Sequence, residues 1–349
     1  MPATLDTSRL GEPVAIDKIS RELKKLWDTG ESAPTRASLI NFAIYCRSVE
    51  AMEANTTLLA EFTRHHACRA LLICVLRDAP APRVQAWVNA HCHLSRAGAK
   101  QVCCEQISFL LEGEIKGRLT NIVFSNLDSD LPLYFWLQGD VSEKLNPNLW
   151  NWIDRLIVDS LAWRDPKAQF ARLNASLTEN KARLTLRDLN WTRSLYVRQA
   201  LSQIFDHPEN LPHLSRLQRV TIAHAPENRV TSLFIIGWLA SHLDWTLKTA
   251  APLVFKDPAD QEIAIELTAT AGEAISRITL GSSDATFTLQ REPVCRYLRA
   301  TLNLPGGREY NHLFPAGPDE MVDLLNEEMS RAARDLIYPP ALAAIEPLL

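Results

Sequence analysis

Two histidines and three cysteines stand close together in the first third of the chain, and these residue types bind metals or undergo thiol chemistry. The residues that could act together are His91, Cys92, Cys103 and Cys104. If residues 83–94 and 100–111 pair as a hairpin, one register sets Cys92 opposite Cys103 and His91 opposite Cys104. Because side chains alternate along a strand, His91 and Cys92 then lie on opposite faces.

Three interpretations of this group stay open. A tetrahedral zinc site needs four converging ligands, and the alternation only half provides them. A redox-responsive thiol pair needs only two adjacent cysteines. The default interpretation is that these are small apolar cysteines packed in a sheet.

The segments around this group predict an α/β fold. Residues 36–46 have strand composition, residues 48–66 have the apolar spacing of a helix, and residues 68–76 are a continuous apolar run. Such a run is typical of a strand covered on both faces, and the β-α-β order favours a parallel core. The further strands expected in this half are 83–94, 100–111, 131–140 and 156–163.

The second half has a similar layout without a repeat in the sequence. A charged helical connection at 164–188 precedes a helix, a strand at 216–225, a helix at 230–243 and three short strand-like pieces. The last expected helix is 319–338, which Pro339 and Pro340 would stop. We therefore predict two α/β domains, each a mixed β-sheet flanked by helices: a helix and linker at 1–35, a first domain at 36–165 and a second at 166–349.

Charge and hydropathy exclude some classes of protein. Lys and Arg number 37 against 41 Asp and Glu, which disfavours a nucleic-acid-binding protein. The longest apolar stretch, 233–240, is too short to span a membrane, and the first residues do not resemble a signal peptide. We expect a cytoplasmic protein, whose seven cysteines favour free thiols over a disulfide framework.

The common nucleotide and catalytic fingerprints are absent. The Gly113-x-x-x-Gly117 spacing lacks both the paired glycines of a dinucleotide site and the Gly-Lys-Ser/Thr end of a phosphate loop. The chain also has no Gly-x-Ser-x-Gly sequence. These patterns predict neither a cofactor nor a catalytic residue.

Isolated carboxylates and histidines give weaker signals. Asp159 lies inside an expected buried strand, where a carboxylate requires a partner. Asp130 and Asp140 flank another strand as turn residues, although loops at strand ends of α/β sheets also hold functional sites. His66 lies where the first crossover helix meets its strand, and we consider it a cap or a site residue.

The helix that begins at Asp188 places an arginine in its apolar stripe. At 100° per residue, Arg198 falls inside the arc that contains Trp191, and Arg193 lies at its edge. One hypothesis is an internal ion pair of Arg198 with a buried aspartate; the other is a protein interface, where Trp and Arg are frequent hot spots. An Arg198 buried against Asp188 or Asp159 would be structural, and one exposed beside Trp191 would mark an interface.

Five segments resemble, in collinear order, the family of OpcA-type glucose-6-phosphate dehydrogenase assembly proteins. The segments are His66 to Arg69, Asp130 to Trp136 followed by Asp140, Asp154 to Ser160 with Asp159, Asp188-Leu-Asn-Trp191-Thr-Arg193 followed by Arg198, and Gly237-Trp238-Leu239-Ala240. Two departures put contact details in doubt: the family's Pro-Trp before the second Arg is Tyr196-Val197, and its His-Pro is His66-Ala67.

The resemblance implies a protein without catalytic activity that binds glucose-6-phosphate dehydrogenase, favours its active oligomer and raises its activity. In some photosynthetic members this activation is linked to thiol state, which makes redox regulation a hypothesis here. The alternative is a sugar-phosphate-binding α/β enzyme or sensor that uses Arg193, Arg198 and the Asp140 loop. The candidate motif or partner-binding residues are Asp188, Trp191, Arg193, Arg198, His66, Arg69, Asp130, Trp136, Asp140, Asp159 and Trp238.

Overall fold

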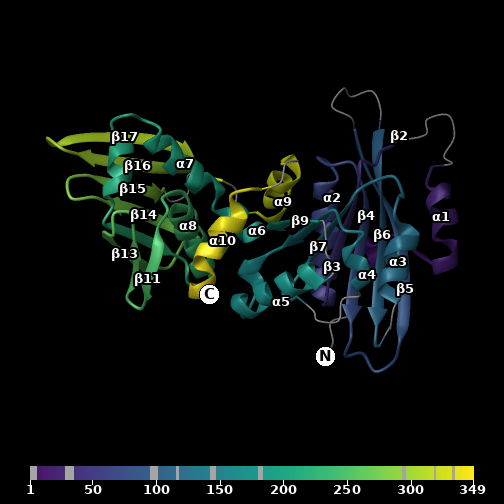
Figure 1. Ribbon diagram of the computed structural model, residues 1–349. Helices are drawn as coiled ribbons and strands as arrows, with labels where there is room; N and C mark the ends of the chain where they lie inside the picture. The colour runs from purple at the N-terminus through teal and green to yellow at the C-terminus, as the bar shows by residue number, and fades with distance from the viewer. Residues whose placement is uncertain are drawn as a thin grey trace. The chain divides into compact units, whose positions relative to one another are not determined.

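The computed structural model describes residues 6–27, 35–94, 101–114, 118–141, 147–179, 184–292, 296–317, 320–331 and 335–349. The chain forms two compact units, each built on its own sheet (Figure 1). Unit 1 comprises Met1–Asp188 and Met321–Arg331, and unit 2 comprises Leu189–Glu320 and Ala332–Leu349. A short helix late in the sequence therefore belongs to the first unit.

Unit 1 contains a nine-stranded mixed sheet with the order β1-β5-β6-β4-β3-β7-β8-β9, and β2 also pairs with β6. The strands are β1 (Glu12–Val14), β2 (Thr35–Arg36), β3 (Ile40–Cys46), β4 (Cys68–Leu76), β5 (Arg83–Leu94), β6 (Gln101–Glu112), β7 (Leu133–Leu137), β8 (Arg155–Val158) and β9 (Thr185–Asp188). From β6 to β9 all neighbouring strands are parallel. Numbered along the chain, these six strands have the order 3-2-1-4-5-6 that is typical of dinucleotide-binding folds.

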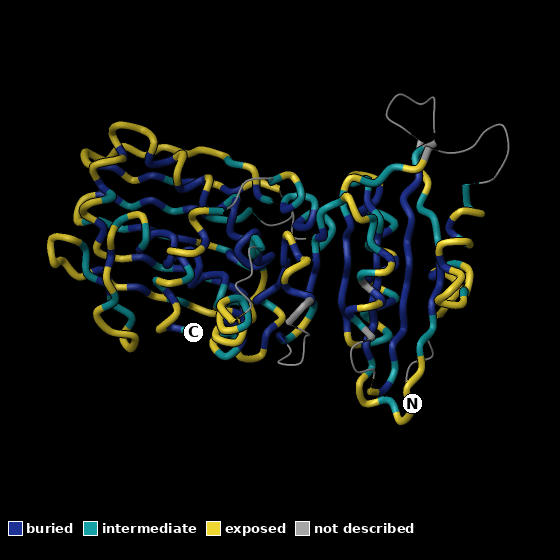
Figure 2. Tube along the Cα trace, turned by 45° about the vertical axis from the view of Figure 1, so that its right-hand side comes forward, coloured by how far each residue is buried: buried dark blue, intermediate teal, exposed yellow. Residues whose placement is uncertain are grey.

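Helices cover this sheet. They are α1 (Ile19–Lys25), α2 (Val49–Phe62), α3 (Arg118–Asn126), α4 (Pro147–Trp150), α5 (Pro166–Glu179) and α9 (Met321–Ser330). The Phe42 ring of β3 stacks on Phe62 of α2 with centroids 4.5 Å apart, and β3 and β4 are buried along almost their whole length (Figure 2). The continuous apolar runs predicted to be covered strands are the centre of the core.

Unit 2 contains an eight-stranded mixed sheet with the order β11-β12-β13-β10-β14-β15-β16-β17. Its strands are β10 (Arg219–His224), β11 (Thr246–Ala250), β12 (Leu253–Lys256), β13 (Glu262–Ala269), β14 (Ile275–Gly281), β15 (Thr286–Arg291), β16 (Tyr297–Leu304) and β17 (Arg308–Pro315), and its helices are α6 (Leu189–Arg193), α7 (Leu195–Phe205), α8 (Arg229–His242) and α10 (Tyr338–Ile345). Among the described strands of this second sheet, only β10 and β13 pair in parallel. The predicted fold class, two mixed sheets flanked by helices, is confirmed.

Several expected boundaries differ. The strand expected at 156–163 ends at Val158, because the Asp159 carboxylate accepts a hydrogen bond from Leu161 N and begins a 3-10 turn. Residues 185–188 of the expected helical connection form β9, which extends the first sheet beyond residue 165. The helix expected from 188 divides at Ser194, whose hydroxyl donates to Trp191 O.

The C-terminal helix was predicted wrongly. α9 ends at Ser330, and Pro339 and Pro340 lie in the first turn of a separate helix, α10. Proline suits this place because the first amides of a helix have no partner within the helix. The two prolines start a helix instead of stopping one.

Candidate functional site

The hairpin register predicted for the cysteine group is confirmed. β5 and β6 pair with Cys92 opposite Cys103 and His91 opposite Cys104. Cys92 and Cys103 form a disulfide, so the expectation of free thiols and the default of packed cysteines are wrong for this pair. The other described cysteines, Cys46, Cys68, Cys74 and Cys104, are free and buried.

The disulfide also removes two thiolates from the zinc hypothesis. His91 Nε2 lies 2.6 Å from Gln106 Oε1, and burial lowers the pKa of this histidine. A hydrogen bond from Cys68 lowers the pKa of the buried Cys104 to about 7. In the part of the chain that the structure describes, no three His, Cys, Asp or Glu side chains gather as metal ligands. A redox role of these sulfurs stays a prediction.

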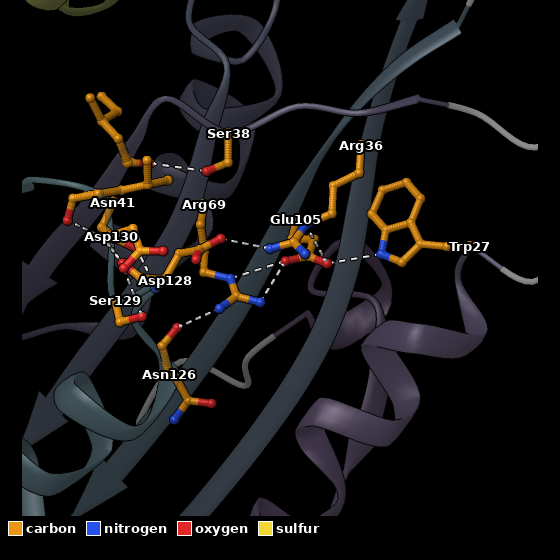
Figure 3. Close-up of polar contacts among 12 residues, drawn as sticks. Trp27, Arg36, Ser38, Asn41, Arg69, Glu105, Asn126, Asp128, Ser129 and Asp130 are labelled. Atoms are coloured by element: carbon orange, nitrogen blue, oxygen red, sulfur yellow. Dashed lines mark hydrogen bonds and ion pairs between the residues drawn. The ribbon is translucent and has the colours of Figure 1, made fainter.

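A buried carboxylate organises the polar residues near the start of the parallel strands of unit 1 (Figure 3). Glu105, only 4% exposed, pairs with Arg69 at 2.8 Å and with Arg36 at 3.2 Å, and it accepts a hydrogen bond from the indole of Trp27. Arg36 also binds Asp128 at 2.9 Å. Because a buried charge requires compensation, this network fixes the family-motif residue Arg69 in place.

The loop before β7 is tied to the same network. The amide of Asn41 donates to Asp128 O and Leu131 O, and its oxygen accepts from Asp128 N. Arg69 donates to Asn126 O at the end of α3. These bonds hold the Asp128–Leu131 loop, with its exposed Asp130, in one conformation.

A second buried cluster in unit 1 holds α9. Arg155 is 4% exposed; it donates to Glu328 O and Arg331 O at the end of α9, and its guanidinium lies over the Tyr134 ring at 4.3 Å. The Glu328 carboxylate lies 3.4 Å from Arg187, and both side chains are buried. A guanidinium at the C-terminal carbonyls of a helix is stabilising, so Arg155 caps α9. Burial first, and then the charge of Arg187, lower the pKa of Arg155.

His66 makes a further contact with α9. Its Nε2 lies 3.0 Å from the side-chain oxygen of Asn326, and its ring packs against Phe62. Burial lowers its pKa. His66 is therefore at the junction of α2 and α9, where a neutral imidazole suits the contact.

In unit 2 the expected Trp-Arg pair is buried. Trp191 is 2% exposed and Arg198 is 6% exposed, with the guanidinium 3.5 Å from the centre of the indole. Arg198 Nε donates to Ser194 Oγ at 3.0 Å, and the indole N–H donates to Asp335 at 2.8 Å. This burial favours a structural brace over an interface, and the carboxylate described next to Arg198 is Asp335, which the sequence had not suggested in place of Asp188 or Asp159.

Asp335 is the acidic member of this brace. Burial raises its pKa, but the hydrogen bonds from Trp191, Ile337 N and Tyr338 N and the charge of Arg198 outweigh that effect and lower the pKa overall. Two of these bonds come from backbone amides at the start of α10. The brace therefore joins α6 and α7 to α10.

The Gly-Trp-Leu-Ala segment lies on α8, where α10 approaches closely. A Cβ on Gly237 would lie 2.2 Å from Ala341 O and 2.7 Å from Ile345 Cγ2. Gly237 thus lets two helix backbones meet, and Trp238 beside it is buried.

We expect Gly237→Ala to lower the free energy of unfolding by about 2 kcal/mol, because α10 must move away to relieve the overlap. Urea unfolding measures this change. Ala240→Gly on the same helix measures the opposite change without a clash: it costs about 1 kcal/mol through helix propensity, and the loss of a buried methyl group adds to this cost. An alanine variant at 237 with wild-type stability would contradict the close approach.

Side chains form hydrogen bonds at the carboxyl ends of β3 and β7, where this strand order binds a dinucleotide in other proteins. The turn after β3 reads Cys46-Arg47-Ser48, and Ser48 Oγ accepts from Ala51 N at the start of α2. Arg47 donates to Asp140 O across this edge, and the indole of Trp163 donates to Gly139 O. Close glycines that would let a pyrophosphate approach are lacking in this turn.

The predicted motif residues are therefore distributed over several places. The buried ones are Asp188, Trp191, Arg198, Trp136, Asp159 and Trp238, and the remainder, Arg193, His66, Arg69, Asp130 and Asp140, are exposed or half-buried. Asp188 accepts a hydrogen bond from Ser160 N within unit 1. A role of any of these residues in partner binding stays a prediction.

Sequence reasoning missed the acidic members of the clusters. Glu105, Glu328 and Asp335 were not singled out, because each lies among charged or polar residues in an ordinary helix, strand or loop pattern. The buried strand position of Glu105 between Cys104 and Gln106 is the one signal that could have found it.

Two family models match this chain in succession. The first, the N-terminal domain of a glucose-6-phosphate dehydrogenase subunit, matches residues 60–175, and the second, the C-terminal domain of the same family, matches residues 184–342. Together the two models account for most of the chain.

Three relatives carry the name putative OxPP cycle protein OpcA. Those of Nostoc punctiforme and Synechocystis are 28% and 25% identical, over 46% and 51% of this chain and 35% and 38% of their own lengths. The Synechococcus elongatus protein is 24% identical over 80% of this chain and 67% of its own length. The match thus spans little more than a third of the length of the first two relatives.

Solved structures give a weaker likeness. An aldose-aldose oxidoreductase from Caulobacter crescentus matches with a TM-score of 0.44 at 9% identity, over 88% of this chain and 96% of that chain. A levoglucosan dehydrogenase bound to NADH and L-sorbose matches with a TM-score of 0.41, also at 9% identity, over 82% of each chain. At these values the likeness supports no conclusion about activity. No helix among the described residues is long and apolar enough to cross a membrane.

Proposed function

We propose that this chain, which belongs to the glucose-6-phosphate dehydrogenase subunit family of OpcA-type proteins, binds glucose-6-phosphate dehydrogenase and favours its active oligomer without catalysing a reaction itself. The consecutive match of both family domains, from residue 60 to residue 342, carries the proposal. A protein that binds one oligomeric state more tightly shifts the enzyme toward that state by the difference in affinity.

The side chains at the carboxyl ends of β3 and β7 support a role other than catalysis. Arg47 and Trp163 donate hydrogen bonds to the loop after β7, at the strand ends where this strand order binds a dinucleotide in other proteins. Glu50 in the first turn of α2 adds a negative charge where a pyrophosphate would need a positive potential. These residues disfavour NADP as a ligand of this chain.

The test is a titration of the cognate dehydrogenase with the full chain. We expect mass photometry to show a complex and a larger share of the active oligomer, with a parallel rise in dehydrogenase activity. Heat-unfolded chain is the control for non-specific effects. If a folded sample neither forms the complex nor raises the activity, the proposed function is wrong.

The alternative, a sugar-phosphate enzyme or sensor, loses its central ligand because the Arg198 guanidinium is buried over Trp191. We expect neither glucose 6-phosphate nor NADP alone to raise the melting temperature of the chain. A rise of several degrees with either compound would favour the alternative.

A further inference from the structure

We infer that unit 1 contacts the dehydrogenase with the surface at the N-terminal ends of β3, β7 and β8. We also infer that the partner offers a basic surface beside an apolar pocket. The inference rests on the proposed function and adds the place and chemistry of the contact. We define the Trp152 patch as Arg36, Leu39, Phe124, Asp128, Asp130 and Trp152.

Trp152 is the unusual residue of this patch. It lies between α4 and β8 with 58% of its surface exposed, although a tryptophan is among the most favourable side chains to bury. Its ring packs only partly on Phe124 of α3, with centroids 4.7 Å apart. Leu39, directly before β3, is 72% exposed. Tryptophan and arginine are the residue types most frequent in protein-binding hot spots.

The strand register brings the segments of the patch that precede β3, β7 and β8 to the same end of the sheet. Asn41 pairs with Leu133 and Tyr134 pairs with Arg155, so the residues that precede β3, β7 and β8 end up side by side. The segments at this edge are therefore 36–39, 126–132 and 150–154. They are distant in the sequence, and the parallel sheet alone gathers them.

The patch is also fixed before any partner arrives. Asn41 holds the Asp128 loop through three hydrogen bonds, and Arg69 joins Asn126 of α3 to the buried Glu105 (Figure 3). Association of a preorganised surface loses less conformational entropy than association of a mobile one. The buried network therefore also holds the Asp128–Leu131 loop in the conformation that we propose a partner binds.

Charge decides the kind of partner. Among the described charged side chains at these strand ends, the carboxylates that reach the surface are Asp128, Asp130 and Asp154, against the exposed guanidinium of Arg36. Glu105 and Arg155 are buried, and Glu105 pairs with Arg69 and Arg36. Arg64 in the neighbouring segment is neutralised by Glu61 at 3.2 Å. The excess at the surface is negative, and Asp130 is one of its exposed members. Complementarity then requires Lys or Arg on the dehydrogenase surface that receives Trp152.

The test measures binding of full-length variants to the cognate dehydrogenase at about 50 and 200 mM salt. We expect Trp152→Ala to weaken binding at least about tenfold, mainly through faster dissociation. Asp130→Lys should slow association and remove most of the salt dependence. Tyr297→Ala on unit 2, where the tyrosine is 53% exposed, is the matched control and should bind like the wild type.

The outcomes separate the two proposals. Absence of binding by the wild type contradicts the proposed function, and the patch falls with it. If the wild type and Trp152→Ala bind equally well, the function stands and the patch is wrong. Loss of binding by Tyr297→Ala alone would place the contact on unit 2. Circular dichroism should show all three variants folded, because both aromatic side chains are exposed.

Discussion

Glu328→Leu is expected to destabilise unit 1 by about 3–5 kcal/mol, the usual cost of removing one partner of a buried ion pair. The carboxylate lies 3.4 Å from Arg187, and Arg155 binds the backbone of the same residue. Without it, two buried guanidinium groups are left beside each other with less compensating charge. For a domain of this size the loss corresponds to a melting temperature lower by about 10 °C.

Two further variants test whether this loss of stability comes from the buried ion pair. Glu327→Gln removes the neighbouring carboxylate, which is partly exposed and pairs with Arg331, so it should cost at most about 1 kcal/mol. The double variant Arg187→Met/Glu328→Leu should be more stable than Glu328→Leu alone, since the unpaired charge is also gone. Equal melting temperatures for Glu328→Leu and Glu327→Gln would show that the buried cluster does not hold α9.

Asp335→Asn should destabilise unit 2 by about 2–3 kcal/mol at neutral pH, because Arg198 loses its neighbouring charge and Trp191 its acceptor. The pKa of Asp335 is lowered in the folded chain, so its stabilisation is fully present above the unfolded pKa of about 3.9. The stabilisation is lost as the pH falls through the folded pKa. The difference between wild type and variant should therefore be constant from pH 7 to about 5 and shrink below pH 4.

Urea unfolding across this pH range checks the sign. Asp244→Asn is the matched control: Asp244 is exposed in unit 2, and its positive φ of 55° suits asparagine equally well. It should show no change at any pH. A stability difference for Asp335→Asn that grows on acidification would contradict the assigned brace.

The hydrophobic pattern was sufficient to predict the fold class of both units. The continuous apolar run at 68–76 is a strand buried on both faces, β4, as predicted. The apolar spacing at 48–66 reflects a helix buried on one face, and the structure has α2 at Val49–Phe62. The register around Cys92 followed from the expected hairpin of residues 83–94 and 100–111, but the bond between Cys92 and Cys103 did not, because composition alone argued for free thiols. Local rules failed at Pro339, where the same residue suits the end of one helix or the first turn of the next.

The sequence by itself determined the family and the fold class, since collinear motifs and apolar periodicity are properties of the order of residues along the chain. Only the tertiary structure decided which contacts the side chains of the motif residues make. Arg198 could have faced a partner or the interior, and the effect of its charge on Asp335, 137 positions later, depends on how the segment before α10 returns to α6 and α7. The same holds for Glu328 with Arg155 and for the neighbouring strand ends that Leu39, Asp130 and Trp152 precede. Contacts between distant segments depend on packing, and no local pattern encodes them.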